Sequence, residues 1–142
     1  MESNSSLLKS TILVVDDTPE NLWFMSSLLK SRYHVKIATN GLKAIEIARA
    51  HPQPDLILLD IVMPEMDGYE VCLTLKGAAE TNDIPIIFLT GRATAEDEAH
   101  GRMIGAIDYI TKPIDSDRVL ASIDAHLTAI AMANACEKKH SQ

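Results

Sequence analysis

Hydrophobic and polar positions repeat along the chain with two periodicities, one typical of strands and the other of helices. Five short apolar segments fit strands, at residues 11–15, 34–38, 55–59, 84–89 and 106–110. The stretches between them have helical spacing, so strand and helix follow one another through the chain. This alternation predicts an α/β fold in which helices cover a parallel sheet.

The apolar content of each segment predicts where its strand lies in the sheet. The sequences ILVV, LILL and IPIIFL are apolar almost throughout and are expected in central strands covered on both faces. Segments 34–38 and 106–110 alternate polar and apolar residues, which indicates edge strands. With right-handed crossovers, the prediction is a doubly wound five-stranded sheet of order 2-1-3-4-5. Ligands bind such sheets outside the carboxyl ends of the strands, here between strands one and three.

Turn and capping residues mark where the helices begin. We expect helices from Pro19 to about residue 31, after Asn40-Gly41, from Asp67-Gly68, at Thr94 and after Ser116. The last helix keeps its apolar stripe for at least three turns and continues past the expected end of a compact domain. We therefore expect an N-terminal extension at 1–10, one domain at 11–128, and a C-terminal helix extension or linker at 129–142.

Composition and charge narrow the class of protein. A chain of 142 residues with 46% hydrophobic and 23% charged residues fits one globular domain. The first ten residues lack a secretory pattern, which favours a cytoplasmic location. Acidic residues outnumber basic ones by 20 to 13, and the basic residues form no stripe, which argues against direct nucleic-acid binding. Cys72 and Cys136 match no metal or redox spacing, so we expect reduced thiols.

Three aspartates follow strands that the predicted order makes neighbours. Asp16 and Asp17 end the first strand, and Asp60 ends the third. An aspartate after a strand often only caps the next helix, but three at one mouth repel one another unless a divalent cation offsets their charge. Mg²⁺ suits this mouth because it prefers oxygen ligands and binds through one or two carboxylates and a substrate phosphate.

Two further residues are expected at the same edge of the sheet. Thr90 ends the fourth strand, and Lys112 follows the fifth, directly before Pro113. A hydroxyl and an ammonium group placed there could bind and neutralise the oxygens of a phosphoryl group. Either residue alone is weak evidence, since threonine is common in strands and a lysine after a strand is usually a surface residue.

These motifs in this order resemble the response-regulator receiver domain, which has the flavodoxin-like fold of the chemotaxis regulator. The resemblance covers about residues 11–127. In VVDD, Asp16 and Asp17 match the metal-binding acidic pair; in LILLDIVMPEMDG, Asp60 matches the phosphoacceptor. In IIFLTG, Thr90 matches the switch hydroxyl, and in DYITKP, Tyr109 and Lys112 match the switch aromatic residue and the phosphoryl-contacting lysine.

The resemblance implies a site and a chemistry. A Mg²⁺ or Mn²⁺ ion would be held by Asp16, Asp17, Asp60 and the main-chain carbonyl of Val62. A phosphohistidine on a sensor histidine kinase or phosphotransfer protein would donate the phosphoryl group to Asp60. Val62 and Arg92 border the entry path and are candidates for tuning the phosphoryl lifetime. The bond between Lys112 and Pro113 is usually cis in this family.

The same resemblance implies a response to phosphorylation. Thr90 would move towards the phosphoryl group, Tyr109 would turn inward, and the face formed by the fourth helix, fifth strand and fifth helix would change shape. That face would bind a partner or a second copy of the chain. The segments PEMDGYEVC and GAIDYITKPI also resemble receivers joined to cyclic-di-GMP domains, so an output domain beyond this chain is an open possibility.

Two alternatives stay open at this stage. One is a phosphohydrolase with an aspartyl nucleophile, although the DxD sequence of such enzymes is absent because Thr18 and Pro19 follow the acidic pair. The other is a pseudo-receiver, a docking module with the fold but not the chemistry. We favour a phosphorylated switch that is not a multiple-turnover enzyme by itself.

Overall fold

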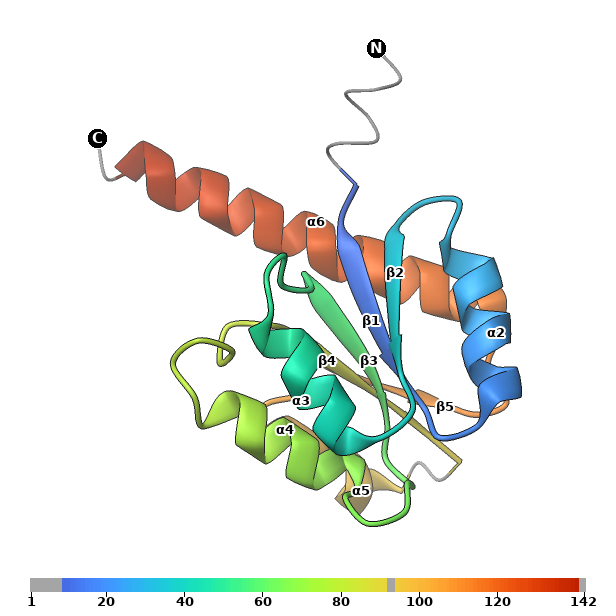
Figure 1. Ribbon diagram of the computed structural model, residues 1–142. Coiled ribbons are helices and arrows are strands. Elements are labelled where there is room, and N and C mark those ends of the chain that lie inside the picture. The colour runs from blue at the N-terminus through green and yellow to red at the C-terminus, as the bar shows by residue number, and fades with distance from the viewer. Residues whose placement is uncertain (1–8, 92–93, 141–142) are drawn as a thin grey trace.

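A parallel sheet forms the centre of the computed structural model, which describes residues 9–91 and 94–140, with side chains up to residue 134. Within this part of the chain, five strands lie in the order β2-β1-β3-β4-β5 (Figure 1). The strands are β1 (Thr11–Val15), β2 (His34–Ala38), β3 (Leu56–Asp60), β4 (Ile86–Thr90) and β5 (Asp108–Thr111). The predicted order and the two predicted edge strands are confirmed.

The strands begin later than three of the predicted segments. Asp55 precedes β3 and bonds Thr11 of β1 twice: its N–H donates to the Thr11 carbonyl and its carboxylate accepts from the Thr11 N–H, both at 2.7 Å. Ile84 is held in a turn by its bond to the Thr81 carbonyl, and the N–H of Ala106 closes the end of a helix at the Gly101 carbonyl. At the other ends, Asp60 and Thr90 are themselves the last residues of β3 and β4.

Five helices of the described chain connect and cover the strands: α2 (Pro19–Leu29), α3 (Gly41–Arg49), α4 (Gly68–Lys76), α5 (Ala95–Met103) and α6 (Ser116–His140). Three predicted caps are present, since side chains of Asn40, Asp67 and Thr94 each accept a hydrogen bond from the first turn that follows. Helix α2 ends at Leu29, before the predicted residue 31, because Arg32 and Tyr33 turn back to bond the Leu29 carbonyl.

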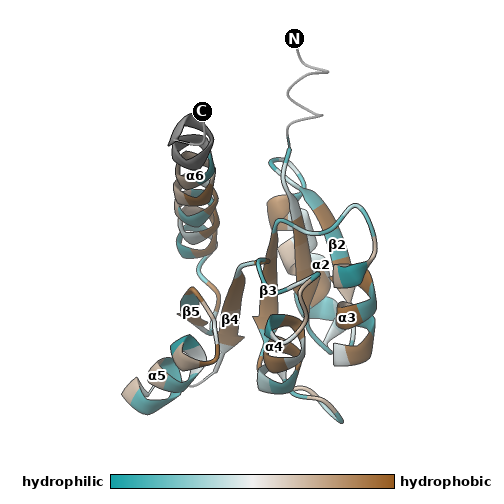
Figure 2. Ribbon diagram, turned by 90° about the vertical axis from the view of Figure 1, so that its left-hand side faces the viewer, coloured by the Kyte–Doolittle hydropathy of each residue, from teal (hydrophilic) through white to brown (hydrophobic). Residues whose placement is uncertain are grey.

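The sheet has a hydrophobic core on each face. One core gathers Phe88 and Tyr109 with side chains of α3 and α4, and the other gathers side chains of β1, β3 and β4 with those of α2 and α6. The central strands supply both cores, which explains why they are apolar throughout. Figure 2 shows α6 on one side of the sheet and α4 on the other, with hydrophobic colour on the strands between them.

Helix α6 is anchored in its first half and exposed in its second. Val119 and Ile123 are fully buried against the sheet. From residue 128 to residue 134 every described side chain is exposed, and the second half of the helix extends past the sheet (Figure 1). None of the helices in the described residues combines the length and apolar content that crossing a membrane requires.

Candidate functional site

The first two residues of the site follow the buried strand β1. Asp16 continues the sheet by one bond, from its N–H to the Ala38 carbonyl at 3.1 Å, and only 3% of its surface is exposed. Asp17 comes next and is exposed. Because successive residues of an extended chain point in different directions, the pair presents one buried and one accessible carboxylate.

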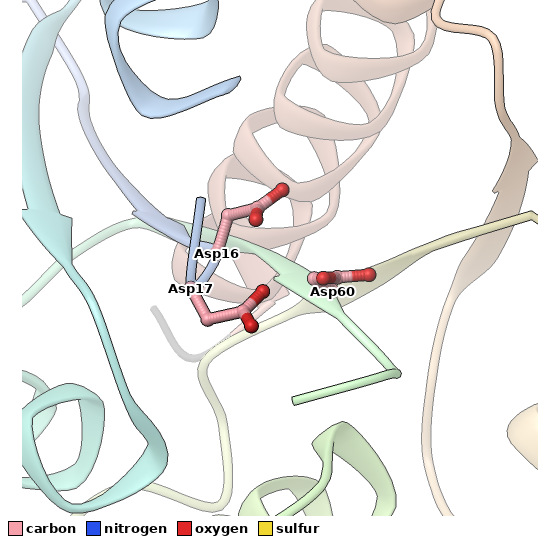
Figure 3. A group of neighbouring side chains, drawn as sticks. All are labelled: Asp16, Asp17 and Asp60. Carbon is pink, nitrogen blue, oxygen red and sulfur yellow. The ribbon is translucent and has the colours of Figure 1, made fainter. Parts of the chain in front are cut away.

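Asp60 ends the neighbouring strand β3 and brings a third carboxylate to the same place. Val15 of β1 pairs with Leu59 of β3, so the residue after each lies at the same level of the sheet. Each of the three aspartates has a carboxylate oxygen within 4.8 Å of such an oxygen of the other two. Figure 3 shows the three side chains at the ends of these two strands. The prediction that they meet at one mouth is therefore correct in geometry.

Lys112 supplies the positive charge of the group. Its Nζ lies 3.2 Å from Asp60 Oδ1 and 3.6 Å from Asp16 Oδ2. Its main-chain N–H donates to the Thr90 carbonyl at 2.6 Å, which fixes the start of the loop after β5 to the end of β4. The Lys112–Pro113 bond is cis, as the resemblance implied.

Burial and charge act on the Asp60 carboxyl in opposite directions. Removal from water raises its pKa, the nearby Lys112 ammonium lowers it, and the charges of Asp16 and Asp17 raise it again. The net result is a pKa above the ordinary value of 3.8. A cation added to this mouth would favour the ionised form.

The loop after Asp60 is held close to the site by a glycine. The N–H of Gly68 donates to the Ile61 carbonyl at 2.8 Å. A Cβ at residue 68 would lie 2.5 Å from the Asp60 carbonyl oxygen, so only glycine permits this approach. The predicted helix start at Asp67-Gly68 is confirmed, since Asp67 caps α4 and Gly68 is its first residue, but the sequence does not reveal the contact of Gly68 with the site.

Val62 and Arg92 were expected at the entrance. The Val62 side chain is 74% exposed, two residues beyond Asp60, and it lines a shallow cavity with Thr90 and Tyr109. Arg92 lies outside the described residues.

Thr90 and Tyr109 lie on the neighbouring strands β4 and β5, where Tyr109 pairs with Phe88 and Thr90 with Thr111, and both line one cavity. Thr90 is 4% exposed and ends β4, and Tyr109 is 3% exposed and packs edge-on against Phe88. Tyr69 of α4 also packs against Phe88, and burial together with a hydrogen bond to Tyr109 raises the pKa of Tyr69. The structure thus records an inward Tyr109; its exchange with a second position stays a prediction.

Asp108 is a polar junction that the sequence did not single out. Its carboxylate accepts hydrogen bonds from the Ser122 hydroxyl at 2.6 Å and the Tyr109 N–H at 2.8 Å, and lies 3.2 Å from His126 Nε2. Burial raises the pKa of Asp108, but these bonds and the Arg118 guanidinium outweigh it and hold the pKa below 3.8. The junction joins β5 to α6 directly beside Tyr109.

Asn21 is the other residue that the sequence did not reveal. Its side-chain amide donates to Asp16 Oδ2 at 3.2 Å, and the Thr18 N–H donates to Asp16 Oδ1 at 2.9 Å. The motif PENL around Asn21 reads as an ordinary helix start, and no spacing rule connects residue 21 with residue 16. The contact depends on how the loop between β1 and α2 turns.

Comparison with known proteins places the chain among signalling domains. The sequence matches the family model described as response regulator receiver domain over residues 12–124. A Vibrio cholerae protein named "Probable cyclic di-GMP phosphodiesterase" is 46% identical over 125 residues, which are 88% of this chain and 28% of that protein. Protein PilH of Pseudomonas aeruginosa is 38% identical over 117 residues, which are 82% of this chain and 96% of PilH.

Solved structures agree with these matches. The chemotaxis protein CheY4 of Vibrio cholerae superposes with a TM-score of 0.77 at 26% identity, over 82% of this chain and 98% of CheY4. The chain spans little more than a quarter of the phosphodiesterase-named relative but nearly the whole of PilH. Relatives of very different length therefore share this region.

Proposed function

The chain belongs to the response regulator receiver domain family of two-component signalling, and from this premise we propose that Asp60 accepts the phosphoryl group. The observation that carries the proposal is the meeting of three carboxylates with one lysine at the ends of β1 and β3. The proposed nucleophile Asp60, the negative charges of Asp16 and Asp17, and the positive charge of Lys112 lie together there.

The donor set fits a hard divalent cation. Asp16, Asp17 and Asp60 offer carboxylate oxygens, the ligands that Mg²⁺ or Mn²⁺ prefers, and the Val62 carbonyl is a candidate fourth ligand. When bound, the ion offsets the negative charge of the carboxylates and of the incoming phosphoryl group. Lys112 alone would leave the group of three aspartates with an excess of negative charge.

Asp60, Lys112 and Thr90 have different roles in the proposed phosphoryl transfer. An Asp60 carboxylate oxygen forms a bond to phosphorus while the bond from phosphorus to the donor histidine nitrogen breaks, leaving the electron pair on that imidazole. Lys112 neutralises phosphoryl oxygens as the group arrives, and the Thr90 hydroxyl donates a hydrogen bond to one of them. Water later hydrolyses the acyl phosphate, and the resemblance makes Val62 and Arg92 candidates for tuning the lifetime of the phosphoryl group.

The partners follow from this chemistry. A sensor histidine kinase or a phosphotransfer protein supplies the phosphohistidine, and the reaction takes place in the cytoplasm. Phosphorylation is read out at the face of α5, β5 and α6, through Thr90 and Tyr109, where a second copy of the chain is one candidate partner. The buried Tyr109 beside the Asp108 junction supports this route, because both lie on β5 and contact neighbouring elements.

The chain is proposed to act as a switch module rather than as an enzyme with turnover. Residues 11–128 are assigned to the receiver, residues 1–10 to an N-terminal extension, and residues 129–142 to a C-terminal helix extension or linker. The similarity to a protein named as a cyclic di-GMP phosphodiesterase supports a cyclic-di-GMP-related output domain as a candidate for what this receiver controls.

Labelling with a small phosphodonor tests the proposal. The chain is incubated with acetyl phosphate and MgCl₂, and intact mass is expected to rise by one phosphoryl group. Asp60→Asn should abolish this increase in mass. Asp55→Asn, the same substitution just before the other end of β3, should leave the increase unchanged. An unlabelled wild-type chain would favour a docking module, and repeated hydrolysis of phosphomonoesters would favour a phosphohydrolase.

A further inference from the structure

Asn21 stands out because it binds a residue of the site without belonging to the group of charges. It is the third residue of α2, and its own N–H donates to the Thr18 carbonyl at 3.1 Å. The first turn of the helix therefore fixes the position of its side chain. From there the amide reaches back to Asp16 Oδ2 at 3.2 Å.

The Asp16 carboxylate is buried and needs donors for both of its oxygens. Oδ1 accepts from the Thr18 N–H at 2.9 Å, and Oδ2 accepts from Asn21 and lies 3.6 Å from Lys112 Nζ. A buried carboxylate that loses a neutral donor attracts a nearby cation more strongly. Removing the Asn21 amide would therefore increase the hold of Asp16 on Lys112.

The ammonium group of Lys112 does not contact the two carboxylates at equal distances. Its Nζ now lies closer to Asp60, at 3.2 Å, than to Asp16, at 3.6 Å. A cavity of about 220 Å³ lined by Asp16, Asn21, Phe24 and Lys112 gives the lysine side chain space to move towards Asp16. The balance between the two carboxylates thus depends on what else binds Asp16.

We propose that Asn21 is a positioning residue for phosphoryl transfer, whose amide occupies Asp16 Oδ2 and so leaves Lys112 directed at Asp60. This inference rests on the proposed function and adds to it a residue outside the charged group. Asn21 touches neither the phosphoryl group nor Asp60; it acts through Asp16 and Lys112.

Two substitutions separate this role from a contribution to folding. Asn21→Ala removes the amide, and Asn21→Asp keeps the shape but replaces the donor by a second carboxylate. We expect Asn21→Ala to slow labelling by acetyl phosphate and MgCl₂ about fivefold, the factor for one neutral hydrogen bond. Asn21→Asp should slow it at least as much, because its carboxylate repels that of Asp16. The urea midpoint of each variant is measured, so that labelling rates are compared under conditions in which the chain is fully folded.

The position of the lysine gives a second readout, independent of phosphorylation. In metal-free protein labelled with ¹³C and ¹⁵N at lysine, both Asn21 variants should shift the Lys112 side-chain signals, assigned with Lys112→Arg. Glu20→Ala, which changes the exposed neighbour in the same turn, should leave these signals and the labelling rate unchanged.

The outcomes distinguish the two proposals. A wild-type chain that acetyl phosphate does not label overturns the proposed function. A labelled wild-type chain together with Asn21 variants of unchanged rate and unchanged Lys112 signals overturns the positioning role alone. A rate loss that disappears when the variants are compared fully folded, or normal labelling of Asn21→Asp, also overturns it, because a merely structural asparagine would behave in that way.

Discussion

Helices α2 and α5 both begin at the edge of the sheet where the carboxylates lie, yet they are held to the molecule differently. Helix α2 buries Leu22, Met25 and Leu29, and its first turn is bonded to the site through Asn21. Helix α5, all nine of whose residues the structure describes, buries only Gly101. Helix α2, next to the residues proposed for phosphoryl transfer, is therefore firmly packed. Helix α5, part of the face proposed to respond to phosphorylation, has few buried apolar contacts that would oppose its movement.

The largest expected effect tests the firmly packed side. Lys112→Met keeps much of the side-chain length but removes the charge next to Asp60, so phosphorylation by acetyl phosphate should slow about 100-fold. Lys43→Met, at the start of α3, serves as the control and should keep the wild-type rate. A Lys112→Met rate within twofold of wild type would remove the lysine from the proposed mechanism.

A second change on the same side should lower stability. Gly68→Ala places a Cβ 2.5 Å from the Asp60 carbonyl oxygen and 2.8 Å from Ile61 Cα, both of which are main-chain atoms with little freedom to move. We expect a loss of about 3 kcal/mol in the free energy of unfolding, measured by urea denaturation. Gly91→Ala, where a Cβ meets nothing within 4 Å, is the matched control.

The raised pKa of Asp60 predicts how stability depends on pH in metal-free buffer. The pKa of Asp60 in the folded state lies above the ordinary value of 3.8, so the unfolded chain loses this proton first as pH rises. Between the unfolded and the folded pKa, the folded state therefore becomes less stable with rising pH. Asp60→Asn should therefore be more stable than wild type at pH 7. This advantage should disappear as pH falls below 3.8 in parallel urea titrations, and an advantage independent of pH would contradict the assignment.

The smallest expected effect belongs to α5. Gly101→Ala gains helix propensity of about 1 kcal/mol, which is offset by tight contacts of the new Cβ with Phe88 and Tyr109 at 3.1 to 3.3 Å. The net change in unfolding free energy should stay within about 1 kcal/mol. The Tyr109 ring signals in NMR spectra should nevertheless shift, while the rate of Asp60 labelling stays the same. A large loss of stability would show that α5 is as firmly held as α2.

Much of the fold could be predicted because each strand carries its own pattern. Continuous apolar runs identified β1, β3 and β4 as central, alternation identified the edges, and handedness then fixed the strand order. That order alone brought Asp16 and Asp17 to Asp60, so the charged group needed no knowledge of side-chain contacts. Apolar patterns do not record the local bonds at the strand starts, where Asp55 accepts the Thr11 N–H through its side chain and the N–H of Ala106 closes a helix.

Contacts that depend on how loops turn could not be predicted. The amide of Asn21 reaches Asp16 only because the chain folds back between β1 and α2. The approach of Gly68 to Asp60 and the junction at Asp108 likewise join residues whose spacing in the sequence carries no signal. The alternation in β5 also leaves open how deeply the Tyr109 ring is buried, which the structure sets at 3% exposed. The roles of the individual site residues stay predictions, which the substitutions above can test.

The long helix α6 has a mechanical consequence. Its first half is bonded to β5 by Ser122 and Asp108, and its second half extends beyond the sheet as far as residue 140. At 1.5 Å per residue the extending part is roughly 20 Å long, so a tilt of about 10° at the anchored half moves the far end by roughly 3 Å. A change beside Tyr109 that tilted the helix in this way would deliver a displacement as large as an atomic diameter well away from Asp60.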